Sequence, residues 1–163
     1  MATSLKWCCN QKDGIKLIEP NENLASGYLE MAEKAIGTMN REKNLNLQFA
    51  ISAGYYSMYY SLYAVLMKIG IKCEIHTCTL EFMKELLKEF YSKEDSDVIK
   101  KAFSTRNTSQ YYVDKIIAKE DIESLFSNAL PFLDKSKNIL AKINEKDILK
   151  IRKEIEKVLL AKT

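Results

Sequence analysis

Two residues of this chain have side chains suited to chemistry on a phosphate group. His76 is the only histidine among 163 residues. Because an imidazole titrates near neutral pH, it could act as an acid or base, or as a structural hydrogen-bonding group. Arg106 begins a polar stretch, residues 106–112, that reads RNTSQYY. Its guanidinium could hold a phosphate through two parallel hydrogen bonds, or could make an ordinary surface or capping contact.

The four cysteines offer a second kind of chemistry. In a reducing cytosol, Cys8, Cys9, Cys73 and Cys78 are expected to be free thiols. Cys73, His76 and Cys78 also form a Cys-x2-His-x-Cys cluster, to which one of the other two cysteines could add a fourth zinc ligand. Structural zinc sites usually present more regular pairs of ligands. We therefore predict neither a metal site nor a cofactor.

A tyrosine-rich stretch is the third notable feature. On a helix, Tyr55, Tyr59 and Tyr63 would share one face, and Tyr56 and Tyr60 another. Such rings could stack on nucleic-acid bases, or they could line a protein core with each hydroxyl hydrogen-bonded. A base-stacking surface normally includes lysine or arginine, and this stretch has neither. The pattern favours a core or a helix–helix interface.

Apolar residues recur at three- and four-residue spacing along most of the chain, which is typical of amphipathic helices. The pattern predicts helices near residues 24–39, 44–69, 80–90, 95–103, 122–133 and 148–159. The polar stretch 106–112 has poor helix propensity and is expected to follow the end of the fourth helix. Pro131 lies inside the fifth predicted helix and should kink it.

Capping residues mark several helix ends. Asn21 or Asn23 could cap the first predicted helix, and Asn144 the last. Thr77 or Thr79 could cap the third. The second should end at Gly70, because glycine readily adopts the left-handed conformation that terminates helices.

The second predicted helix is unusual, because residues 44–67 contain no charged side chain. The stretch is long enough to cross a bilayer, which takes about 20 mainly apolar residues. It also carries serines, asparagines, a glutamine and several tyrosines, which would be costly in hydrocarbon. We therefore predict a helix buried on nearly all sides within a helical bundle.

Composition limits the fold and the location. The chain has only 5 glycines and 2 prolines, too few turn-forming residues for a many-stranded β fold. We predict an all-α protein, an antiparallel up-and-down bundle of about five to six helices. Residues 1–20 would be an N-terminal extension and 21–163 a single domain. The net charge of +3 neither requires nor excludes an RNA partner. The start lacks the apolar run of a signal peptide, which predicts a cytoplasmic protein.

Several segments in order resemble one family. They are ISAGYYSMYY at residues 51–60, AVLMKIGI at 64–71, His76, and RNTSQY at 106–111. Together they resemble the HEPN domain (higher eukaryotes and prokaryotes nucleotide-binding), over about residues 23–140. The resemblance implies an up-and-down helical bundle that commonly forms homodimers. It also implies a prokaryotic setting beside a minimal nucleotidyltransferase, in toxin–antitoxin-like pairs.

Many HEPN domains are metal-independent ribonucleases with an arginine, a polar residue and, a few residues later, a histidine. Arg106 and Asn107 match the first two positions, but Tyr111, Tyr112 and Val113 stand where the histidine would be. A tyrosine has an ordinary pKa near 10 and is a poor base at neutral pH. The sequence is therefore similar to the branch whose motif ends in tyrosine and whose ribonuclease activity is in doubt.

Three functions follow from the resemblance and the residues. The first is binding of a nucleotide, an RNA phosphate or a nucleotidyltransferase-type protein. In that function Arg106 would hold the phosphate, Asn107 and Tyr111 would donate hydrogen bonds beside it, and His76 would complete the pocket. The second is a ribonuclease that uses Arg106 and His76, although nothing in the sequence places these two side by side. The third is a ligand-free helical dimerisation module. We expect binding rather than catalysis.

Overall fold

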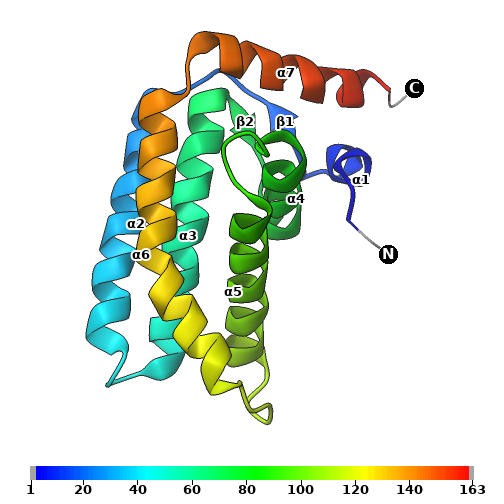
Figure 1. Cartoon of the computed structure of the whole chain (residues 1–163). Helices are drawn as coiled ribbons and strands as arrows, with labels where there is room; N and C mark the ends of the chain where they lie inside the picture. The colour runs from blue at the N-terminus through cyan, green and yellow to red at the C-terminus, as the bar shows by residue number, and fades with distance from the viewer. Residues whose placement is uncertain (1–2, 162–163) are drawn as a thin grey trace.

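The computed structural model describes residues 3–161, which contain seven helices and one pair of short strands. Four long helices run up and down beside one another (Figure 1): α2 (Glu22–Glu42), α3 (Leu47–Ile69), α5 (Lys93–Tyr111) and α6 (Lys119–Lys142). The predicted all-α bundle is confirmed.

Helix α3 lies at the centre of the bundle and packs against α2, α5 and α6. Most of its side chains are buried, which explains why its sequence lacks charge. At Gly54 a Cβ atom would collide with Leu125 of α6 and Met39 of α2, so the missing side chain lets the three helices approach closely. None of the helices in residues 3–161 combines the length and hydropathy needed to cross a membrane.

Two of the predicted caps and the predicted helix stop are found. The Asn21 side chain accepts a hydrogen bond from the backbone N–H of Leu24 at the start of α2. Asn144 forms a reciprocal capping box with Asp147 at the start of α7 (Glu145–Leu160). Gly70 ends α3 in the left-handed region, with φ of 87°. These features depend on neighbouring residues, which is why the sequence predicts them.

The predicted cap of the third helix was wrong. Helix α4 (His76–Leu86) begins after Ile75 and has no side-chain cap. The Thr79 hydroxyl lies 3.4 Å from the Ile75 carbonyl oxygen and 3.3 Å from the Tyr59 hydroxyl. Thr79 therefore makes a tertiary contact with Tyr59 and does not cap the helix.

The boundary predicted for the fourth helix was also wrong, because α5 continues through the polar stretch to Tyr111. Within this stretch Arg106 is buried, and packing of α5 against α3 outweighs the low helix propensity of its residues. Helix α6 likewise continues past Pro131, and Figure 1 shows it bending part-way along its length.

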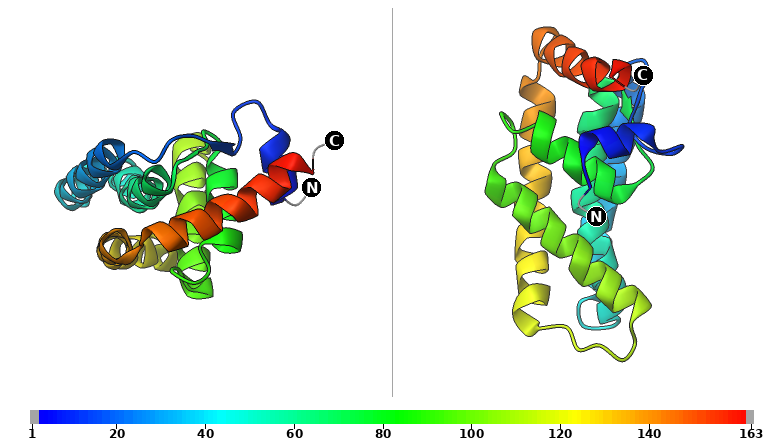
Figure 2. Two further views of the ribbon diagram at one scale, coloured as in Figure 1. Left: turned by 90° about the horizontal axis from the view of Figure 1, so that it is seen from above. Right: turned by 90° about the vertical axis from the view of Figure 1, so that its right-hand side faces the viewer.

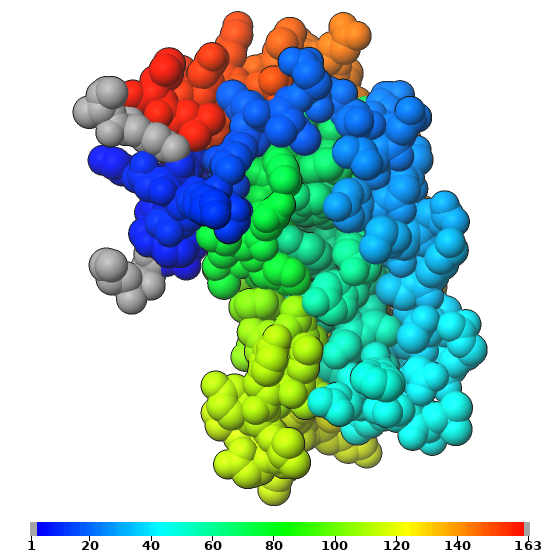
Figure 3. Space-filling model, turned by 180° about the vertical axis from the view of Figure 1, so that it is seen from behind, coloured from blue at the N-terminus to red at the C-terminus, as the bar shows by residue number. Residues whose placement is uncertain are grey.

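The N-terminal extension packs on the bundle. Strand β1 (Lys16–Leu17) pairs antiparallel with β2 (Ile71–Lys72), with Leu17 opposite Ile71. Helix α1 (Leu5–Asn10) contacts α4 and α7, and α7 crosses one end of the bundle (Figures 1 and 2). Seen from behind, the N-terminal segment lies against both of these helices (Figure 3).

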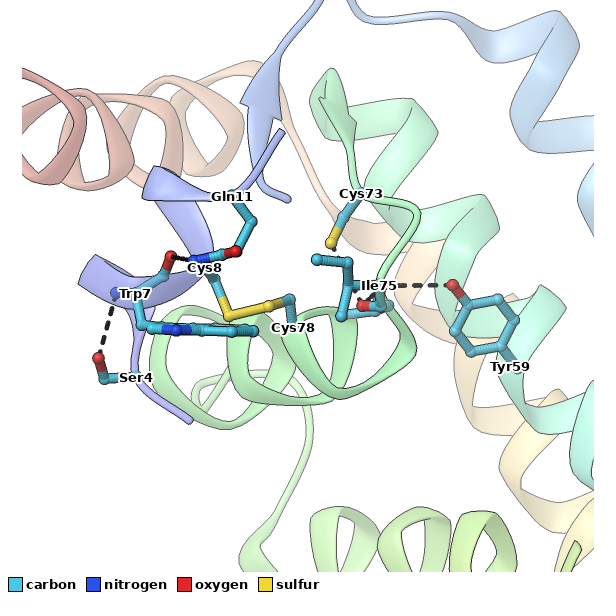
Figure 4. The surroundings of a disulfide bond; sticks show 9 residues. Ser4, Trp7, Cys8, Gln11, Tyr59, Cys73, Ile75 and Cys78 are labelled. Carbon is cyan, nitrogen blue, oxygen red and sulfur yellow. Dashed lines mark hydrogen bonds between the residues drawn. A yellow bond between two sulfur atoms is a disulfide. The ribbon is translucent and has the colours of Figure 1, made fainter. Parts of the chain in front are cut away.

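The prediction of free thiols was wrong for two cysteines. Cys8 of α1 and Cys78 of α4 form a disulfide with their Cα atoms 5.5 Å apart (Figure 4). The two residues are separated by 70 positions in the sequence, so only the docking of α1 on α4 brings them together. The bond also removes both from any zinc-ligand set. No group of three or more histidine, cysteine or acidic side chains within residues 3–161 is arranged to hold a metal ion.

Candidate functional site

Arg106 projects from α5 into the contact between α5, α3 and the start of α4, and only 6% of its surface is exposed. Its guanidinium carbon lies 5.1 Å from the centre of the Tyr55 ring, 5.2 Å from that of Tyr56 and 5.9 Å from that of Phe103. Aromatic faces attract a cation at such distances. We call Arg106, His76 and these three aromatic residues the Arg106 cluster.

The hydrogen bonds of Arg106 all go to neutral groups. Nη1 donates to the Asn107 Oδ1 at 3.0 Å and to the Gln110 Oε1 at 3.2 Å, and Nη2 donates to the Tyr56 hydroxyl at 3.2 Å. Nε is buried and has no partner in the part of the chain that the structure describes. Within residues 3–161, no carboxylate forms an ion pair with this guanidinium. A guanidinium has five N–H donors, so these three bonds leave the positive charge unbalanced and two donors unused.

His76 is the first residue of α4 and joins the same cluster. Its Nδ1 lies 2.7 Å from the Tyr55 hydroxyl, and its ring stacks on that of Tyr59 with centroids 4.0 Å apart. Burial, together with the positive charge of Arg106, lowers the pKa of His76 to about 4. The imidazole is therefore neutral at pH 7.

The tyrosines beside the imidazole keep their protons. Burial raises the pKa of Tyr55 and of Tyr59 well above the ordinary value of a phenol. The Tyr55 hydroxyl can therefore donate its hydrogen bond to Nδ1 of His76, in which case Nε2 carries the ring proton. The predicted burial of the tyrosine-rich face is confirmed, since Tyr55, Tyr59 and Tyr63 are all buried.

The structure brings together three of the four predicted site residues: Arg106, Asn107 and His76. The fourth, Tyr111, is 65% exposed on the last turn of α5. A helix advances 100° per residue, so the side chain that returns to Arg106 is the one four residues later, Gln110. The role predicted for Tyr111 stays a prediction.

Sequence reasoning did not identify Tyr55, Tyr56 or Gln110 as partners of Arg106. The four-residue spacing from Arg106 to Gln110 would have indicated this contact if the helix had been predicted to continue through Gln110. No signal in the sequence pointed to the tyrosines, because they lie about 50 positions away on α3.

Comparison with known proteins bears on this arrangement. The family model of the HEPN domain matches residues 25–140, a range that contains every member of the Arg106 cluster. The chain belongs to the HEPN family. The match extends from α2 into α6 and so covers the four-helix bundle of this HEPN protein.

Two archaeal proteins are similar to this HEPN chain. One, from Methanocaldococcus jannaschii, is named "Putative toxin MJ0142"; it is 34% identical over 128 residues, which are 75% of this chain and 83% of the relative. The other, from Archaeoglobus fulgidus, is named "UPF0332 protein"; it is 27% identical over 116 residues, which are 70% of this chain and 93% of the relative.

One end of this HEPN bundle is rich in exposed apolar side chains. We define the apolar end by Leu45 and Phe49, where α2 connects to α3, and by Val113 and Ile116, where α5 connects to α6. The Gln48 side-chain amide donates a 3.0 Å hydrogen bond to the Ser109 carbonyl oxygen and so links the first turn of α3 to the last turn of α5, beside the two connections. They lie next to each other at the lower end of Figure 3. Exposed apolar patches of this kind often mark interaction sites.

Proposed function

We propose that this HEPN protein binds the phosphate groups of RNA or of a nucleotide at the Arg106 cluster. The observation that supports this most strongly is a buried guanidinium with unused donors and no carboxylate partner. A buried charge is costly unless it is paired. A bound phosphate would supply the missing negative charge and could accept two parallel hydrogen bonds from the guanidinium.

The neighbouring residues have distinct roles in this proposal. The Gln110 side chain is exposed, so it can turn aside when a phosphate oxygen takes its place on Nη1. Asn107 and Tyr56 then keep the guanidinium plane in position. The neutral imidazole of His76, held through Nδ1 by Tyr55, donates from Nε2 to a phosphate oxygen. Tyr111 donates to a part of the ligand beyond the end of the helix.

Binding of a labelled single-stranded RNA, measured by fluorescence anisotropy, tests the proposal. Arg106→Met should lower the affinity at least about tenfold, because a hydrogen bond to a charged group contributes about 1.5–3 kcal/mol. Arg41→Met is the matched control, since Arg41 is exposed on α2 and its loss removes the same charge. Equal losses in both variants would show that the Arg106 cluster is not the binding site.

A metal-independent ribonuclease is the second candidate, and the proximity of His76 to Arg106 supports it. Arg106 would stabilise the charge that develops on the phosphate, and His76 would take the proton of the attacking 2′-hydroxyl. A pKa of about 4 makes His76 a weak base at neutral pH, so we place binding first. RNA cleavage in the presence of a chelator should be lost in both His76→Ala and Arg106→Ala. Cleavage that survives in either variant would rule out this mechanism.

We also propose that the protein forms a homodimer through the apolar end, and that a minimal nucleotidyltransferase is its partner in a toxin–antitoxin-like pair. The exposed apolar residues support the first idea, and the toxin name of one relative supports the second. Light scattering should show a dimer that Phe49→Asp dissociates. Leu149→Asp, an equally exposed position on α7, should leave it intact. A monomeric wild-type protein would contradict the dimer.

The partner needs a separate experiment. Co-purification from the native cells, followed by mass spectrometry, should recover a nucleotidyltransferase. A dimer that binds neither RNA nor such a partner would leave the ligand-free dimerisation module as the remaining function.

A further inference from the structure

A lysine-lined cleft lies between α4 and the first turns of α5, away from the Arg106 cluster. Its volume is about 410 Å³. The residues that line it include four lysines, a single carboxylate and a buried serine: Lys84, Lys88, Lys93, Lys100, Asp97 and Ser96. We call it the lysine cleft.

The charges of the lysine cleft are only partly balanced. Lys84 pairs with Glu81 and Glu85, and Lys93 pairs with Asp97. Lys88 and Lys100 form no ion pair with any residue in the part of the chain that the structure describes. Two ammonium groups are therefore available to an anion.

Ser96 also lines the cleft, and only 7% of the residue is exposed. A phosphate oxygen bound in the cleft could accept a hydrogen bond from the Ser96 hydroxyl and would at the same time lie near the two unpaired lysines.

The lysine cleft leads toward Arg106. Lys84 and Lys100 also line an adjoining cleft together with Phe103. The Phe103 ring lies 5.9 Å from the Arg106 guanidinium carbon and 6.1 Å from the His76 ring. On α5, Ser96, Lys100 and Phe103 follow one another at spacings of four and three, so they share one helix face. Ten residues of helix separate Ser96 from Arg106, a distance of about 15 Å.

We infer that the lysine cleft binds backbone phosphates of a single RNA strand whose neighbouring segment reaches the Arg106 cluster. The inference rests on the proposed function and deepens it, because it makes the ligand a strand rather than a mononucleotide. A mononucleotide at Arg106 is too short to reach Ser96. A strand can place one phosphate at each site, with Phe103 between them available for contact with a base or sugar.

A paired-lysine variant tests the inference on the full-length protein. Lys88→Gln combined with Lys100→Gln removes the two unpaired charges of the cleft, and both side chains are exposed, so the fold should tolerate the change. Lys146→Gln combined with Lys153→Gln removes two exposed charges from α7 and is the matched control. Affinity for a labelled single-stranded RNA is measured by fluorescence anisotropy between 50 and 200 mM salt. Circular dichroism verifies that both variants are folded.

The salt dependence separates a bound phosphate from a general loss of charge. Each phosphate contact on a single strand contributes about 0.7 to the slope of log affinity against log salt, so the cleft variant should have a slope about 1.4 shallower than wild type. Over this fourfold range of salt, wild-type affinity should then fall about sevenfold more than that of the cleft variant. The control should keep the wild-type slope. Binding of AMP should be the same in wild type, the cleft variant and the control.

The outcomes distinguish the inference from the proposed function. If the cleft variant matches the control while Arg106→Met loses RNA binding, the inference is overturned and the proposed function stands. If the cleft variant loses binding and Arg106→Met does not, the cleft binds RNA and the proposed function fails. A wild-type protein that does not bind RNA would overturn both.

Discussion

The two buried or partly buried arginines near α3 are held in opposite ways. At one end of the helix, Arg152 of α7 places Nη1 2.8 Å from the Ile18 carbonyl oxygen and 3.0 Å from those of Ile69 and Gly70. Arg106 of α5 lies further along α3. Within residues 3–161 it has only neutral side-chain partners and aromatic faces, and its Nε has no partner.

This difference indicates different roles for the two arginines. The carbonyl groups at the end of α3 carry the negative pole of the helix dipole, and Arg152 satisfies them at a fixed junction. A Cβ atom at Gly70 would collide with the Arg152 guanidinium and the Ile18 carbonyl oxygen, so the fit is tight. We call this region, together with the Cys8–Cys78 disulfide, the N-terminal junction. It stabilises the fold, whereas the Arg106 guanidinium has hydrogen-bond donors that are unused within residues 3–161.

The largest loss of stability should come from breaking the disulfide. Cys8→Ser combined with Cys78→Ser opens a loop of 70 residues, and the chain-entropy model gives a loss of about 4 kcal/mol in the free energy of unfolding. Urea denaturation measures this loss. RNA affinity at low temperature, where the variant is still folded, should change much less than in Arg106→Met. A stability loss below about 1 kcal/mol would show that the junction does not depend on this bond.

The next largest effect is expected at Arg152. Arg152→Met removes the hydrogen bonds that the guanidinium donates to three carbonyl groups, although the Gly70 carbonyl keeps its bond from the Ile18 backbone N–H. The change should cost about 2–3 kcal/mol in the free energy of unfolding, measured by urea denaturation. RNA affinity should stay unchanged. Lys153→Met, an exposed neighbour on α7, is the control and should have little effect. If folded Arg152→Met protein also fails to bind RNA, the contrast between a structural Arg152 and a ligand-binding Arg106 is wrong.

His76 is expected to make a smaller, pH-dependent contribution to the free energy of unfolding. Because its pKa falls from 6.5 in the unfolded chain to about 4 in the folded protein, the unfolded state binds more protons between these values. The stabilisation is complete above pH 6.5 and is lost as the pH falls toward 4. With a discount for partial solvent exposure, the loss attributable to His76 is about 1–2 kcal/mol. Thermal melts of wild type and His76→Gln at pH 7 and pH 4.5 measure it, and equal pH dependence in both would contradict it.

The smallest change in stability is expected at Arg106, although the loss of binding there is the largest. Arg106→Met removes a buried, unbalanced charge and keeps an apolar side chain among the aromatic rings, so the free energy of unfolding should change by less than about 1 kcal/mol. Urea denaturation measures the change in the free energy of unfolding, and an RNA titration of the same variant measures the loss of affinity. A loss as large as that of Arg152→Met would mean that Arg106, too, is primarily structural.

The sequence predicted the features that depend on neighbouring residues. Apolar spacing indicated the helices, and the uncharged stretch was correctly assigned to a buried central helix. Asn21, Asn144 and Gly70 marked helix ends because a cap or a left-handed turn is formed within a few residues of the chain. The family resemblance drew attention to Arg106 and Asn107 for the same reason, since the motif lies on one short segment.

Contacts between distant segments could be read only from the tertiary structure. The His76 ring meets the Tyr55 hydroxyl across 21 positions, Arg106 meets Tyr56 across 50, and Cys8 bonds to Cys78 across 70. Helix packing decides which of many side chains become neighbours, and one sequence contains no record of that packing. The residue types thus established what chemistry was available, while the packing of α3, α4 and α5 decided that a neutral imidazole and an unbalanced guanidinium share one site.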